Sequence, residues 1–350
     1  MPSIFPRRNS PAWLVTVALL PAAVAADVFT GTDDYRFDEI VPLSLVAPPR
    51  PTSRFGPGPE GWVVLHFSIM ADGSTTNVEV LDAMPETFRS GDVVDAVEEW
   101  TFQPAHVNGA AVDWHNNTVV FNADLAEIPN ISGPRFSTPY TAVQAMVNEG
   151  NLDQAAREAE ANLREATYSL HDIGLGNMQL ALVQMQRQDM HLAHQAITRA
   201  TLPEVTQLTT EELDVALQYR FIIELALGRY MEALDSYQRR DELAGIPAGD
   251  VMMRQVAEIR EALEGDITLG ARGKILDRER GWYFIPSRRT FTLGDVTGDL
   301  DAIRVVCNQR IATLQYQPDV EWSLPANWGV CSLTVVGARN STFTLYEFPG

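Results

Sequence analysis

The chain has 350 residues, a length that predicts two or three domains. Hydrophobic residues make up 45% and charged residues 21%, so the chain can bury ordinary cores and is not generally disordered. Its formal net charge of -20 disfavours binding to nucleic acid or to anionic lipid. With only two cysteines, a metal cluster held by several thiolates is excluded.

Residues 1–26 have the pattern of a secretory signal peptide. Arg7 and Arg8 precede an apolar run that begins at Trp13 and ends in small residues. A helix of this run would be about 21 Å long, shorter than the ~30 Å hydrocarbon core of a membrane. We therefore expect cleavage at the end of this segment and a periplasmic mature protein. The alternative is an uncleaved segment that associates the protein with the inner membrane.

Residues 27–60 read as a Pro-rich leader, because their prolines prevent a continuous helix. Two strands, a helix and a third strand are predicted next. Residues 62–70 alternate apolar and polar side chains, and Asp72-Gly73 marks a hairpin turn before a strand over residues 77–82. An apolar stripe at helical spacing predicts a helix over residues 90–99. The third strand is expected over residues 114–122.

Within this stretch, particular residues resemble the TonB C-terminal domain family. The resemblance covers about residues 45–125. It is carried by Glu60-Gly61-Trp62-Val63, by the Asp72-Gly73 turn, by Trp100-Thr-Phe-Gln-Pro-Ala105, by the run from Gly109 to Val112 and by Phe121. It implies a β-β-α-β fold of the α+β class and a sheet whose last strand receives an extended segment of an outer-membrane receptor. The corresponding partner-binding edge consists of Trp114, His115, Asn116, Asn117, Thr118, Val119, Val120 and Phe121.

Residues 138–264 are helical and repetitive. The run that begins at Gly150 aligns with runs that begin at Gln188 and Gly228, at spacings of 38 and 40 residues. An alanine follows five residues after each start, where a methyl group lets two helices cross closely. The pattern resembles tetratricopeptide repeats, somewhat longer than the usual ~34 residues. It predicts all-α helical repeats whose stacking is required for stability.

Residues 266–350 predict a small all-β, sandwich-like domain. Apolar and polar residues alternate over 303–307 and again over 330–335, and glycine, proline and asparagine mark the turns. Cys307 and Cys331 lie in these two runs. In an exported chain they are predicted to form a disulfide.

Two clusters of side chains are candidate metal sites. His191 and His194 are three residues apart on a predicted helix, but no third ligand follows at a known spacing, so we favour a polar helix face. Asp295, Asp299 and Asp301 lack the spacing of a calcium-binding EF-hand loop, which favours a solvated turn. Motifs of hydrolases, phosphate loops and zinc peptidases are absent from the sequence. We predict no catalytic, cofactor-binding or metal-binding residues and no enzyme activity.

Two functional hypotheses follow. The first is a non-enzymatic periplasmic scaffold of the cell envelope that binds protein partners through the TonB-like sheet edge and the helical repeats. The alternative is a component of an energy transducer coupled to TonB-dependent transport across the outer membrane. The scaffold is favoured because residues 27–45 span at most ~60 Å when extended, which is short for a spacer that crosses the periplasm. Expected partners are proteins, including an outer-membrane receptor segment, with membrane contact only if the N-terminal segment is retained.

Overall fold

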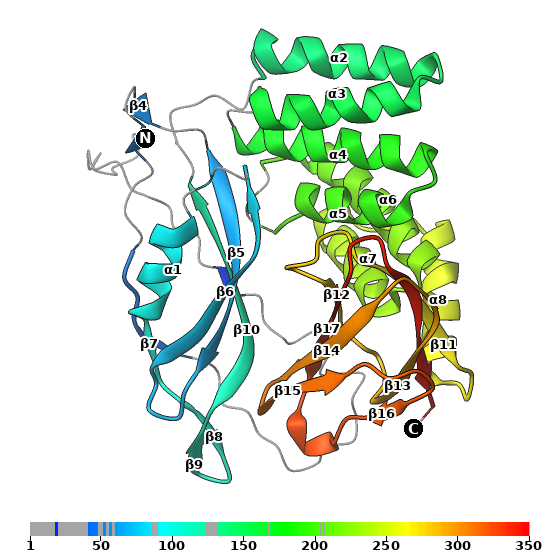
Figure 1. Ribbon diagram of the computed structural model, residues 1–350. Coiled ribbons are helices and arrows are strands. Elements are labelled where there is room, and N and C mark those ends of the chain that lie inside the picture. The colour runs from blue at the N-terminus through cyan, green and yellow to red at the C-terminus, as the bar shows by residue number, and fades with distance from the viewer. Residues whose placement is uncertain are drawn as a thin grey trace.

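A computed structural model describes residues 41–47, 60–85, 88, 90–123, 132–166, 169–203, 205 and 207–349, together with the short strands at 18–19, 52–53 and 56–57. Most of the predicted signal peptide and of the Pro-rich leader lie outside the described residues. Three regions lie side by side in the order predicted: a mixed α/β region, a stack of helices and an all-β region (Figure 1). This confirms the predicted fold class. Within the described residues, no helix is both long and apolar enough to cross a membrane.

The N-terminal region has the predicted order of strand, strand, helix and strand. These elements are β5 (Gly61–Ile69), β6 (Thr75–Met84), α1 (Ser90–Glu98) and β10 (Trp114–Ala123). The sheet is antiparallel with the order β1-β10-β5-β6, where β1 is Ala18–Leu19. Shorter strands surround it: β2 (Pro42–Ser44), β3 (Thr52–Ser53), β4 (Gly56–Pro57), β7 (Thr101–Phe102), β8 (Ala105–Val107) and β9 (Ala110–Val112).

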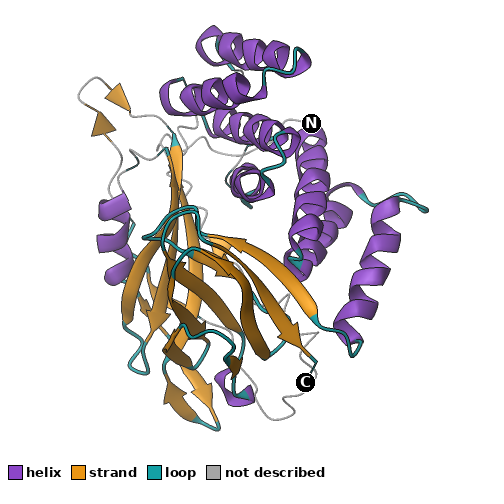
Figure 2. Ribbon diagram, turned by 45° about the vertical axis from the view of Figure 1, so that its right-hand side comes forward, coloured by secondary structure: helices purple, strands orange, loops and turns teal. Residues whose placement is uncertain are grey.

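Both faces of the central strands β5 and β10 are buried. Alternate residues of β5 and β10 face α1 and form a core that contains Val63, Leu65, Phe67, Val93, Val97, Trp100, Val119 and Phe121. The residues between them face the helical stack, where Trp62 and Val120 pack with Leu163, Leu170 and Ile173. The alternation in the sequence predicts the first face, whereas the burial of the second face is a finding of the structure. Figure 2 shows the stacked helices above and to the right of the sheets, whereas α1 lies on the left of the sheets.

The middle region is a stack of antiparallel helix pairs. Its helices are α2 (Pro134–Asn148), α3 (Leu152–Glu165), α4 (Leu170–Gln186), α5 (Met190–Ala200), α6 (Thr210–Leu227), α7 (Tyr230–Ala244) and α8 (Val251–Glu264). Ala155, Ala193 and Ala233, the alanines predicted at the helix crossings, are each 0% exposed. The helical region is therefore as expected, although these repeats are not identified as tetratricopeptide repeats.

The C-terminal region consists of two antiparallel sheets around one core. The strands are β11 (Leu269–Lys274), β12 (Trp282–Phe284), β13 (Thr290–Thr297), β14 (Leu300–Cys307), β15 (Arg310–Gln315), β16 (Glu321–Ser323), β17 (Cys331–Gly337) and β18 (Thr342–Phe348). One sheet has the order β11-β18-β13-β16 and the other β12-β17-β14-β15. Cys307 and Cys331 stand opposite each other on β14 and β17 and form the predicted disulfide.

Polar contacts fix the three regions to one another. Asp82 on β6 accepts hydrogen bonds from Arg199 on α5, at 2.7 and 2.8 Å, and from Arg280 in the β11–β12 loop, at 2.7 Å. The carboxylate of Glu60 accepts a hydrogen bond of 2.6 Å from the amide of Leu170 at the start of α4. Because a single carboxylate joins elements of all three regions, the N-terminal sheet is held as part of one assembly.

Candidate partner-binding strand

The strand predicted to bind a partner, β10, has two different sides. One side pairs with β5 along nearly its whole length, from Trp114 opposite Ile69 to Ala123 opposite Gly61. Among the residues that the structure describes, the other side pairs with β1 at Val119 and Val120. An unpaired strand edge presents backbone N–H and C=O groups that another extended segment can use.

The first part of β10 is irregular. A β-bulge interrupts the pairing with β5 between Trp114 and Asn117, and Asn116 has a positive φ of 61°. The buried side chain of Asn117 donates hydrogen bonds to the carbonyl of Trp114, at 2.9 Å, and to the carbonyl of Phe67, at 3.2 Å. The bulge is therefore held by its own asparagine side chain.

Two residues of the bulge contact the C-terminal sandwich. The amide of His115 donates a hydrogen bond of 2.7 Å to the carbonyl of Asn308, next to the end of β14. The side-chain oxygen of Asn116 accepts a hydrogen bond of 3.0 Å from the hydroxyl of Ser332 on β17. These two polar residues of the predicted partner-binding edge therefore join the strand to the sandwich. This contact cannot be predicted from the sequence, because hydrogen bonds between distant segments produce no periodic pattern.

The imidazole of His115 lies against the sheet. Its Nδ1 is 2.9 Å from the hydroxyl of Ser68 on β5. Partial burial lowers the pKa of His115, against the opposing influence of Asp113. Ser68 itself is 0% exposed, so the pair is a structural contact and not an accessible nucleophile with its base.

The second part of β10, from Thr118 to Ala123, has regular pairing to β5. Val119 packs in the core beside α1, and Val120 packs on the opposite face toward the helices. Both side chains are therefore buried, and what this part of the strand offers outward is its backbone. These residues form the most regular stretch of the predicted edge.

His191 and His194, the candidate metal pair, lie in different surroundings. His194 is inside the helical stack, where its Nε2 is 3.1 Å from a carboxylate oxygen of Glu232 and 3.9 Å from one of Glu224. The two glutamates are bonded to arginines: Glu232 to Arg229 at 2.6 Å, and Glu224 to Arg220 at 2.7 Å. His191 instead lines a pocket beside β11.

The three potential ligand atoms of His194, Glu224 and Glu232 lie within 4.8 Å of one another. Such a set could hold a divalent cation, but the two arginines already neutralise both carboxylates. Burial lowers the pKa of His194 to about 4, whereas burial raises the pKa of Glu224 to about 7. The arginine Arg229 lowers the pKa of Glu232 against the effect of its burial. We interpret the group as a buried charge network that joins α5, α6 and α7.

The acidic cluster Asp295, Asp299 and Asp301 does not form a group of converging ligands among the described residues. The carboxylate of Asp295 accepts a hydrogen bond from the hydroxyl of Tyr346 on β18. The backbone of Asp295 has a positive φ of 53°, as in a turn or bulge. Asp295 lies in β13 and Asp301 in β14, and of the three only Asp299 lies in the turn between these strands.

The fold and this strand define a class of protein: a β-β-α-β module that offers a strand edge. Residues 57–123 match the family described as the Gram-negative bacterial TonB protein C-terminal, so this part of the chain is a TonB C-terminal domain. A solved structure of the TonB2 protein from Vibrio anguillarum is 32% identical, over 23% of this chain and 77% of that chain, with a TM-score of 0.20. No curated protein matches the chain.

The family match of residues 57–123 indicates the general role of this region, but no specific function. TonB C-terminal domains are non-catalytic and periplasmic, and they typically bind TonB-dependent outer-membrane receptors. The disulfide between Cys307 and Cys331 fits an oxidising compartment. A TonB-like role in interaction or energy transduction is therefore indicated for this region.

Proposed function

We propose that the protein is a non-enzymatic periplasmic scaffold of the cell envelope, in which the TonB-like sheet receives an extended segment of a protein partner along β10. The observation that carries the proposal is the fixed position of this sheet. Its second face packs on α3 and α4, and Asp82 joins it to both other regions. A domain held in this way is suited to present a binding edge at a defined place.

The receiving stretch is the regular part of β10, from Thr118 to Ala123. The amide of His115 is already bonded to Asn308, so the bulge at the start of the strand is committed to the sandwich. The outer side at Val119 and Val120 pairs with Ala18 and Leu19, which belong to the predicted signal peptide. Cleavage of that peptide would remove this pairing and open the edge in the mature protein. The added segment would form main-chain hydrogen bonds as a further strand.

Hydrogen exchange on the mature chain tests this proposal. The probe is a synthetic peptide of the N-terminal segment of a TonB-dependent receptor. We expect its addition to slow amide exchange within residues 118–123, because new main-chain hydrogen bonds protect the outward amides. Strand β6 at the opposite edge of the sheet is the internal control and should not change. Protection of β6 alone, or of neither strand, would contradict strand addition at β10.

The family match also favours the second hypothesis, a component of an energy transducer. The two hypotheses differ in the fate of the N-terminal segment, since a transducer requires a membrane anchor and a scaffold does not. Intact mass measurement of the protein from cell fractions separates them. A soluble species that begins near residue 26 supports the scaffold, whereas a membrane-bound species that retains residues 1–26 supports the transducer.

A further inference from the structure

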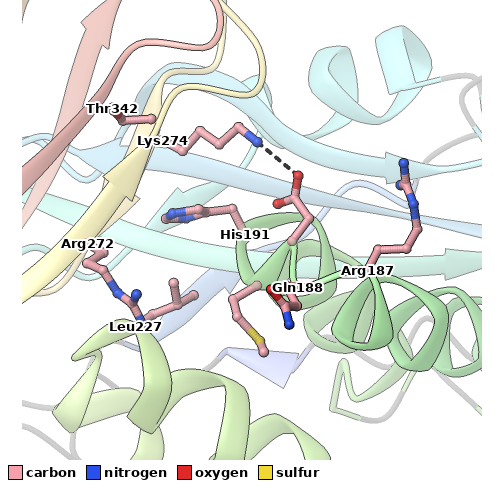
Figure 3. Close-up of a pocket in the computed structure, with 9 residues that line it drawn as sticks. Arg187, Gln188, His191, Leu227, Arg272, Lys274 and Thr342 are labelled. Atoms are coloured by element: carbon pink, nitrogen blue, oxygen red, sulfur yellow. Dashed lines mark hydrogen bonds and ion pairs between the residues drawn. The ribbon is translucent and has the colours of Figure 1, made fainter. Parts of the chain in front are cut away.

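A pocket of about 400 Å³ lies between the helical stack and the C-terminal sandwich, apart from β10. One wall is the turn from α4 to α5, with Gln188 and His191, and the other is β11, with Arg272 and Lys274 (Figure 3). Met190 and Leu227 add apolar surface. The pocket therefore combines polar walls with an apolar portion.

The pocket is cationic, although the whole chain has a net charge of -20. Arg187, Arg272 and Lys274 line it, and Asp189 is the single carboxylate among the lining residues. Arg187 is paired with Asp153 outside the lining at 2.8 Å, so the charge open to a ligand comes mainly from Arg272 and Lys274 on β11. Lys274 donates a hydrogen bond of 2.9 Å to Asp189, and Arg272 donates one to the carbonyl of Ala226. An ammonium group has three N–H donors and a guanidinium group five, so both residues of β11 keep donors for a ligand.

The imidazole of His191 lies between these cationic groups in Figure 3. Burial lowers the pKa of His191 to about 4, with Lys274 acting in the same direction. At neutral pH the ring is therefore uncharged. The neutral ring can donate or accept one hydrogen bond to a ligand in the pocket. Because it carries no negative charge, it does not form an ion pair with Arg272 or Lys274, which stay available to a ligand.

The backbone of Gln188 is a separate observation that points to the same pocket. Gln188 has a φ of 64° and aligns in the repeats with Gly150, whose φ is 79°, and Gly228, whose φ is 74°. A left-handed conformation is unfavourable for residues with a Cβ and is normal for glycine. A strained residue that replaces glycine at one repeat, with its side chain lining a pocket, indicates that the side chain itself has a use.

We propose that this pocket binds a small organic carboxylate. Its anionic oxygens contact Lys274 and Arg272, and the amide of Gln188 donates a hydrogen bond to one of its oxygens. Its carbon skeleton lies against Met190 and Leu227, which is the reason to expect an organic ligand and not an inorganic anion. The ligand would bridge the helical stack and the sandwich.

The test uses the fact that Lys274 is the single lysine of the chain. An acetylating reagent is added to the mature protein, and mass spectrometry follows modification of Lys274 against that of the N-terminal amine. Succinate is the probe. At about ten times its dissociation constant it should slow acetylation of Lys274 about tenfold, because mass action leaves about a tenth of the sites open. The N-terminal amine should be unaffected.

Two further arms separate specific binding from other effects. Sodium chloride at equal ionic strength should not protect Lys274, and inorganic phosphate should protect it more weakly than succinate. The variant Gln188→Gly should raise the melting temperature, because it removes backbone strain, and should weaken the protection by succinate. A purely structural Gln188 would change the melting temperature alone. The proposal is overturned if succinate gives no protection, if chloride protects equally, or if Gln188→Gly leaves protection unchanged.

Discussion

The buried charge network around His194 leads to a prediction about acid sensitivity. His194 on α5 lies 3.1 Å from Glu232, which is bonded to Arg229 at the start of α7. Arg229 in turn donates a hydrogen bond of 2.7 Å to the carbonyl of Tyr283 on β12 and lies 5.3 Å from the ring centre of Trp282. The network therefore joins the helices to the sandwich, and protonation of His194 would disturb both.

The size and sign of the effect follow from the pKa of His194. Burial lowers it to about 4 in the folded protein, from 6.5 in the unfolded chain. The resulting stability is present above about pH 6.5 and is lost as the pH falls toward 4, because the unfolded chain takes up the proton first. Near pH 5 the loss amounts to about 2 kcal/mol in the free energy of unfolding.

Glu224 has the opposite influence on the pH dependence of stability. Its pKa is raised by burial to about 7, above the ordinary 4.5, so its contribution is present at low pH and is lost as the pH rises through 7. The net curve of the native protein therefore combines opposing effects. A variant that changes only the histidine is needed to separate them.

The variant His194→Gln isolates the histidine. Glutamine keeps an N–H donor for Glu232 and does not titrate. We expect urea unfolding to show that the variant loses about 2 kcal/mol less stability than the native protein between pH 7 and pH 5. The measurement at pH 7 is the control, since the imidazole is neutral there in the folded protein and largely neutral in the unfolded chain. Parallel stability curves for the two proteins would refute the assignment of a buried neutral imidazole.

Three further predictions concern stability. Reduction of the disulfide between Cys307 and Cys331, 24 residues apart in sequence, should cost about 3 kcal/mol, seen as a lower melting temperature in the presence of a reductant. Asp82→Asn should lower the free energy of unfolding by about 1.5 to 3 kcal/mol and speed hydrogen exchange in β6 and α5. Its control is Glu79→Gln, which weakens an exposed ion pair with Arg304 and should change the free energy of unfolding by less than about 1 kcal/mol. Gly228→Ala should destabilise the protein by about 1 to 3 kcal/mol more than Gly150→Ala in urea unfolding, because its Cβ would lie 2.0 Å from the carbonyl oxygen of Gly270, whereas Gly150 has open space. Equal effects of Asp82→Asn and Glu79→Gln would contradict the role of Asp82 in joining the regions. Equal effects of Gly228→Ala and Gly150→Ala would contradict the close approach of Gly228 to Gly270.

Local patterns in the sequence predict the main strands and helix of the TonB-like region and the helices of the stack. The alternation in β5, the turn at Asp72-Gly73 and the alanines at the helix crossings each reflect the geometry of a single element or of two neighbouring ones. The same holds for the disulfide, because alternating runs around both cysteines place them on strands. These features depend on a few consecutive residues, which is the range over which periodicity carries information.

Contacts between the regions could not be predicted in this way. Asp82 and Arg199 are 117 residues apart, and Asp82 and Arg280 are 198 apart, so no spacing rule relates them. The second buried face of β5 was missed for a related reason. Trp62 and Val64 are apolar like their neighbours, but a strand nine residues long can bury one face or both, and only the position of the helices decides which.

These unpredicted contacts determine which part of the TonB-like sheet a partner can use. Packing on α1 and on the helical stack covers both faces, so side chains such as Val119 and Val120 are not available for recognition. At the outer edge of β10, the bulge is bonded to the sandwich, which leaves the backbone from Thr118 onward. A partner that binds there must be recognised mainly through main-chain hydrogen bonds, which depend little on sequence. In the proposed scaffold, any selectivity would therefore come from surfaces next to the edge, on the sandwich and the helical stack.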